Sequence, residues 1–184
     1  STITGTAGST VSNLTINTTG AVSVGAVGTD IGTVTITQSG GTTFSSTVDA
    51  ATVTLSNGAA ASSITFSGNV TSTTGLSAAA GTAAYNVVFN GSSNTIAGAT
   101  TFSNTGTVTF GNGGDTINFT GGVTATVPSQ VNIAGIVTAT NSNISIGDSN
   151  TPTVLIGHST ISGNTSGNIT LGGTVNGLFI FVLN

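Results

Sequence analysis

The chain repeats a short pattern in which two apolar residues flank a single polar residue, bounded by Gly, Asn or Ser. Examples are Leu14-Thr15-Ile16, Val34-Thr35-Ile36, Ile64-Thr65-Phe66, Val108-Thr109-Phe110 and Ile169-Thr170-Leu171. Successive side chains of a β-strand point to opposite faces, so the apolar pair shares one face and the polar residue occupies the other. Each repeat therefore predicts a short strand with one buried side.

The spacing of these strands favours an all-β solenoid. The polar centres lie at residues 15, 23, 35, 54, 65, 109, 118, 132, 145 and 170, mostly about 8 to 20 residues apart. A coil of about 20 residues gives roughly nine coils, and at ~4.8 Å per strand a rod about 40 Å long. Residues 78–84 interrupt the pattern, so a Greek-key β-sandwich is the alternative. Either way, residues 1–184 are expected to form one domain.

The composition excludes several classes of function. Among 184 residues there is no Lys, Arg, Cys, Met or Trp, and charged residues make up 2%, against roughly 25% in ordinary soluble domains. A nucleic-acid partner is not expected, because nothing is available to neutralise phosphates. A transmembrane segment is not expected either, since no apolar run approaches ~18 residues. The mean hydropathy of +0.41 favours an ordered chain over a disordered one.

Several stretches resemble bacterial cell-surface β-strand-repeat proteins, namely autotransporter passenger domains, filamentous-haemagglutinin-like adhesins and some surface-layer proteins. These stretches are Gly32–Thr37, Ile64–Val70, Gly106–Asn112 and Ile169–Thr174. The resemblance covers nearly the whole chain and concerns its composition. It implies an extracellular, surface-displayed stalk, adhesin or lattice protein, and it carries over no functional residue.

The two ends of the chain also resemble each other. Ser1-Thr2-Ile3-Thr4-Gly5 matches Ser159-Thr160-Ile161-Ser162-Gly163, and Asn184 ends an apolar run as Asn17 does. These matches suggest about one unit of a longer tandem array, in which neighbouring repeats stack. Chance matching in a chain so rich in Ser and Thr is the alternative.

The most apolar segment is the predicted assembly segment, and it shows no alternation. It consists of Leu178, Phe179, Ile180, Phe181, Val182 and Leu183. Without alternation, both of its faces should be buried. It could be a core strand of the last coil, a strand donated to a neighbouring subunit, or an apolar run left at the edge of the described chain.

A calcium site is one interpretation of the segment Gly111-Asn112-Gly113-Gly114-Asp115-Thr116-Ile117. It partly resembles the calcium nonapeptide of RTX proteins, with Asp115 as the acid and Phe110 in place of the first Gly. Calcium prefers carboxylate and carbonyl oxygens, but a single repeat supplies half a site. A turn before a strand is the other interpretation, and no other cofactor is expected.

Enzyme activity is not expected. Asp148 and His158 are ten residues apart and lack a nucleophile elbow. Asp30 and Asp49 are interpreted as turn residues, since Asp supports turns. Catalysis would require several Asp residues to meet in space.

The expected function is therefore structural: a stalk, fibre or lattice held by stacked strands, through self-association or neighbouring repeats. Three alternatives remain open. An adhesin would bind glycans or host proteins, with Tyr85 as the only tyrosine; a filament subunit would donate a strand. An ice-binding solenoid would display Thr-x-Thr pieces such as Thr33-Val34-Thr35, but Asn118, Asn132 and Ser145 are expected to interrupt the ladder.

Overall fold

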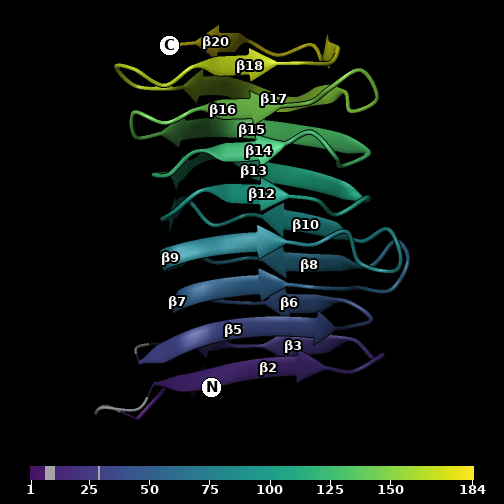
Figure 1. Cartoon of the computed structure of the whole chain (residues 1–184), viewed down its shortest axis with the longest axis vertical. Helices are drawn as coiled ribbons and strands as arrows, with labels where there is room; N and C mark the ends of the chain where they lie inside the picture. The colour runs from purple at the N-terminus through teal and green to yellow at the C-terminus, as the bar shows by residue number, and fades with distance from the viewer. Residues whose placement is uncertain (7–10, 29) are drawn as a thin grey trace.

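The structure, a computed structural model, describes residues 1–6, 11–28 and 30–184. These residues form a β-solenoid of about eight turns, with no helix in the part of the chain described. Figure 1 shows the strands stacked one above another along the longest axis, with the N-terminus at one end and the C-terminus at the other. The solenoid prediction is confirmed, and the strand pairings are parallel, unlike those of a Greek-key sandwich.

The pairings divide each coil among three faces, which we name A, B and C. Five long strands turn a corner and contribute to two faces each. Face A contains β2 (Ser12–Asn17), β5 (Ile31–Gln38), the second halves of β7 (Val48–Leu55) and β9 (Val70–Ala78), β12 (Thr100–Phe102), β14 (Val123–Ala125), β16 (Ile144–Ile146) and β18 (Ile169–Leu171).

Faces B and C are built in the same way. Face B contains β3 (Val22–Val24), β6 (Thr42–Phe44), β8 (Ser63–Phe66), β10 (Asn86–Phe89), the first halves of β13 (Thr107–Phe119), β15 (Gln130–Ala139) and β17 (Thr153–Ser162), and β19 (Val175–Asn176). Face C contains β1 (Thr2–Ile3), β4 (Ala26–Val27), the first halves of β7 and β9, β11 (Ser93–Ile96), the second halves of β13, β15 and β17, and β20 (Phe181–Leu183).

Coil length varies more than the sequence pattern indicates. Val34 pairs with Val53, whereas Ser145 pairs with the more distant Thr170, so the later coil takes more of the chain. The predicted coil length was therefore slightly short, and the predicted number of coils slightly high. The extra residues of the later coil lie in its corners, because β16 and β18 pair without a register shift.

The interruption at residues 78–84 is not a break in the solenoid, because Ala78 ends β9 and residues 79–84 form a corner loop. The Tyr85 hydroxyl lies 2.7 Å from the Ala79 carbonyl oxygen and 3.2 Å from that of Leu55. Asn57 holds the tip of the loop by accepting the Thr82 N–H at 2.9 Å. The next strand, β10, then resumes pairing with β8. A sequence without the strand pattern is accommodated here because buried and backbone polar groups find partners.

The core is a narrow column of aliphatic and Phe side chains. On face B, the rings of Phe44, Phe66 and Phe89 stack with centroids 5.1 Å apart. Phe110 then meets Phe102 and Phe119 from the other two faces, both at 5.5 Å and edge to face. All six rings are fully buried. The Phe residues thus fill the middle of the solenoid, and aliphatic side chains fill the coils on either side.

The resemblance between the chain ends is partly reproduced in the register. Ile3 and Ile161 occupy the same inward column of face C, so the first match aligns structurally equivalent residues. Asn17 lies on face A, whereas Asn184 follows β20 on face C. The second match therefore joins residues that are not equivalent.

Candidate functional site

One outward column of face A consists only of hydroxyl residues. Register pairs place one Thr or Ser from each of the eight strands of this face next to the following one. In chain order these are Thr15, Thr35, Thr54, Ser77, Thr101, Thr124, Ser145 and Thr170. We call this set the hydroxyl column; its members repeat at about 4.8 Å, the spacing of paired strands.

The hydroxyls of this column have no hydrogen-bond partner among the described residues. The outward residues of face B differ, because several bond to one another across coils. Asn132 donates to the Thr109 hydroxyl at 3.1 Å, and the Thr107 hydroxyl donates to the Asn86 side chain at 3.1 Å. The hydroxyl column is therefore a continuous row of donors and acceptors that make no side-chain hydrogen bond within the described chain.

The interruption expected in the Thr ladder does not occur where the sequence placed it. Asn118 lies on face C and Asn132 on face B, so neither belongs to the column. Ser145 is a member and keeps a hydroxyl at its position. The three positions were wrongly treated as equivalent, because strands of all three faces share the same apolar–polar–apolar pattern.

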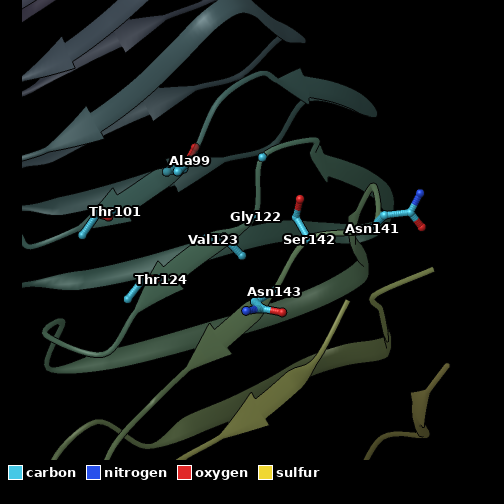
Figure 2. A pocket seen from close by; sticks show the side chains of 10 residues that line it. Ala99, Thr101, Gly122, Val123, Thr124, Asn141, Ser142 and Asn143 are labelled. Atoms are coloured by element: carbon cyan, nitrogen blue, oxygen red, sulfur yellow. The ribbon is translucent and has the colours of Figure 1, made fainter. Parts of the chain in front are cut away.

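A recess of about 360 Å³ lies beside the middle of the hydroxyl column. Figure 2 shows Thr101 and Thr124 on two neighbouring strands, with Gly122, Ser142 and Asn143 on the corner segments next to them. Gly122 has a φ of +90°, and a Cβ there would lie 2.6 Å from the Asn143 carbonyl oxygen. Glycine therefore allows two corners to approach each other at the wall of the recess.

Two further polar groups belong to this recess. Asn143 accepts the Asn168 N–H at its Oδ1 at 3.0 Å, which orients the amide and leaves its NH₂ group as a donor. Thr100 also lines the recess, is 1% exposed, and its hydroxyl has no partner among the described residues. The sequence pattern gives no sign of this site, since only the register of the strands brings these segments together.

The apolar segment Leu178–Leu183 forms the exposed end of the solenoid. Its last three residues are β20, which pairs with β17 on face C. Leu178 is fully exposed, and Ile180 and Leu183 are 66% and 52% exposed. The segment is thus a strand of the last coil, as one interpretation held, but it is not buried within the described chain.

A second recess, of about 380 Å³, lies between this segment and face C and includes Ile136 and His158.

His158 holds the start of the terminal segment in place. Its Nδ1 accepts the Ile180 N–H at 3.1 Å, and its ring meets Phe179 edge to face at 5.7 Å. Asp148 lies in a turn and accepts the Asn150 N–H at 2.8 Å. The two residues therefore have separate structural contacts, and neither contact resembles a catalytic pair.

Asp115 stands at the corner where β13 passes from face B to face C. Its Oδ2 accepts the Asn112 N–H at 2.6 Å, closing the glycine-rich loop of residues 111–114. Among the described residues, no three His, Cys, Asp or Glu side chains gather as a metal site. The carboxylate has a partner in its own loop, and the calcium interpretation remains a prediction.

The other sites suggested by the sequence separate in space. Asp30 occupies a turn with a φ of +65°, as expected, but Asp49 lies within β7 and points outward, so its assignment to a turn was wrong. Tyr85 is completely buried, and burial raises its pKa to about 12. It therefore anchors the fold and offers no ring to an adhesin's ligand.

In the described part of the chain, no helix is long and apolar enough to cross a membrane. Comparison with known proteins adds no relative: no family model, no curated protein and no solved structure matches this chain.

Proposed function

We propose that the chain is an extracellular structural protein, a rod segment that builds a surface stalk, fibre or lattice by stacking β-strands end to end. The observation that carries the proposal is the apolar end coil, in which Ile180 and Leu183 are exposed. Ile161, Val137 and Ile117, which precede Leu183 in its column of face C, are all buried. The described end coil therefore offers an apolar surface that a neighbouring repeat or a second copy can cover.

The construction of the rod supports a mechanical role. Each inner coil is bonded to two neighbours by parallel strand pairing on all three faces. The core continues through every coil as stacked apolar side chains, including the row Phe44, Phe66 and Phe89. A load along the axis is therefore shared among many backbone hydrogen bonds, and the fold depends on no disulfide.

The two ends have matching patterns. Face A begins with Leu14-Thr15-Ile16 and finishes with Ile169-Thr170-Leu171, two apolar–hydroxyl–apolar triplets in one register. A second copy placed end to end would continue the inward apolar columns and the hydroxyl column together. Such a head-to-tail contact does not close on itself, so it produces filaments. Exposed strand edges without Lys or other charges favour this pairing.

The test is sedimentation velocity over a range of concentrations, with negative-stain electron microscopy, on the 184-residue chain. The double variant Ile180→Asp, Leu183→Asp places charge on the end coil. The matched control is Thr95→Asp, Val127→Asp, which adds the same charge at two exposed residues in the middle of the rod.

We expect the wild-type chain and the control to form rods of increasing length as concentration rises, and the end variant to remain as single rods. Wild-type chains that remain single at every concentration would refute the proposal. So would sheets formed side by side, or rods that persist in the end variant.

A further inference from the structure

We propose that Asn112, which is followed by Gly113, is a site of covalent modification, at which the asparagine loses its side-chain amide and becomes an aspartyl or isoaspartyl residue. The reaction needs no enzyme, because the chain itself supplies both reacting groups. The site lies in the corner loop of β13, away from the end coil, and is independent of the proposed assembly.

The reaction requires that the backbone nitrogen of the next residue reach the side-chain carbonyl carbon of the asparagine. The Gly113 nitrogen gives up its proton to the solvent and attacks Cγ of Asn112, and the new C–N bond closes a succinimide ring. The bond from Cγ to Nδ2 breaks, and Nδ2 leaves as ammonia. Water then adds to either carbonyl of the ring, which opens to an aspartyl or an isoaspartyl residue.

The chain contains four Asn-Gly pairs, and the sequence alone treats them as equal. They begin at Asn57, Asn90, Asn112 and Asn176. Glycine favours the reaction at each of them, since it has no Cβ to hinder the approach of the backbone nitrogen. The fold therefore decides which pair reacts.

Among the described residues, the pair at Asn112 alone leaves both reacting groups unrestrained. Asn112, Gly113 and Gly114 are exposed, and the Asn112 side chain makes no hydrogen bond within the described chain. The pairing of β13 with β15 stops at Phe110 and resumes at Asp115, so the Gly113 N–H has no strand partner there. A Cβ at Gly113 or Gly114 would meet nothing within 4 Å. The loop therefore has room to bring the Gly113 nitrogen to Cγ.

The other three pairs are restrained by neighbouring segments. Asn57 accepts the Thr82 N–H at 2.9 Å and donates to the Thr82 hydroxyl at 3.0 Å. Gly91 is buried, and a Cβ there would lie 2.5 Å from a backbone oxygen of the preceding coil. Asn176 belongs to β19 and pairs with Val154. Each of these pairs must open locally before it can react, which lowers its rate by the fraction of time that it is open.

The modification changes the charge of the corner and leaves the coil paired. β13 is held on both sides of the loop, with Phe110 opposite Ile133 and Asp115 opposite Gly135. The product adds one carboxylate to a chain whose formal net charge is −4. The corner therefore gains negative charge as the protein ages, while the strands keep their register.

The test is peptide mapping by mass spectrometry after incubation of the 184-residue chain at pH 8, once folded and once in urea. Chymotrypsin cuts after Phe, so Phe110 and Phe119 place Asn112 in a short peptide apart from the other three pairs. Electron-transfer fragmentation distinguishes aspartyl from isoaspartyl products. Asn112→Gln removes the site, and Asn176→Gln is the matched control at another exposed pair.

In the folded chain we expect Asn112 to lose its amide at least about fivefold faster than the other three pairs, since freeing each of them costs about one hydrogen bond. In urea the four rates should converge, because unfolding removes the restraints. Asn112→Gln should abolish the fast reaction, and Asn176→Gln should retain it.

Three results would overturn the proposal: an unreacted Asn112, a rate at another pair that equals or exceeds it in the folded chain, or the same advantage for Asn112 in urea. A product that contains no isoaspartyl residue would also overturn it, because the reaction would then not pass through the succinimide.

Discussion

Tyr85 offers the sharpest test of how a solenoid tolerates an irregular corner. The side chain is completely buried, and its hydroxyl lies 2.7 Å from the Ala79 carbonyl oxygen. Tyr85→Phe keeps the ring and removes this donor. The Leu55 carbonyl retains the Ala79 N–H at 2.8 Å, so the loss falls mainly on the Ala79 carbonyl. Ala79 is exposed and this bond is only partly buried, so water can replace the lost donor and the cost is about 0.5–1.5 kcal/mol, the net contribution of one hydrogen bond.

The same residue predicts a loss of stability at alkaline pH. Burial raises the pKa of Tyr85 to about 12 from 10.0. In the unfolded chain the phenol ionises near pH 10, whereas the folded chain keeps it neutral until about pH 12. Stability from this group is therefore complete below pH 10 and is lost as pH rises towards 12. A pKa difference of about two units corresponds to a loss of at most about 2.7 kcal/mol in the free energy of unfolding. Screening of the hydroxyl by water reduces this loss to about half.

Urea unfolding monitored by far-UV circular dichroism at pH 7 and at pH 11 measures both effects. At pH 7 we expect the wild type to be more stable than Tyr85→Phe by about 1 kcal/mol. At pH 11 this difference should shrink, because the variant has no phenol to ionise. A difference that stays constant between the two pH values would refute the inference that Tyr85 is buried as a neutral donor.

Three further predictions concern the core and corners. Phe66→Ala should cost about 3–5 kcal/mol in urea unfolding, because it leaves a cavity between Phe44 and Phe89. Gly135→Ala should destabilise more than Gly113→Ala: both have positive φ, but only at Gly135 does a Cβ meet backbone, 2.4 Å from the Asp115 oxygen. Millimolar Ca²⁺ should leave the unfolding temperature unchanged, because no three His, Cys, Asp or Glu side chains gather as a metal site among the described residues; a rise that disappears in Asp115→Asn would contradict this and support the calcium interpretation.

The strands could be predicted from the sequence because the apolar–polar–apolar pattern matches the alternation of buried and outward-facing residues in each strand. In Val34-Thr35-Ile36, the two apolar residues are fully buried and Thr35 faces outward. Thr100-Thr101-Phe102 lacks this pattern, since a Thr takes the inward position, and this strand was missed.

The stacking of strands could not be predicted, because the pattern does not record the face to which a strand belongs. The step along the chain from Thr35 to its partner Thr54 is shorter than the step from Ser77 to its partner Thr101. Corner residues absorb such differences, and their conformations depend on contacts with adjacent coils. The lack of alternation in residues 178–183 predicted a strand with both faces buried. The structure instead has a bend at Leu178 and Phe179, followed by a short strand, β20.

The lack of charge is a physical condition for the columns that stack along the rod. Two like charges at ~4.8 Å repel by about 1 kcal/mol even in water, so an outward column of Lys or Glu would oppose the stacking of its own coils. Hydroxyl and amide side chains avoid this cost. Asp49, the only charged residue at an outward strand position in the described chain, is followed in its column by the neutral Thr71 and Thr95. Because the strand edges of the end coil also carry hydroxyl residues in place of charged ones, no charge repulsion opposes the pairing of a further strand with them. Composition therefore links the regular stacking within the rod to its proposed growth beyond one chain.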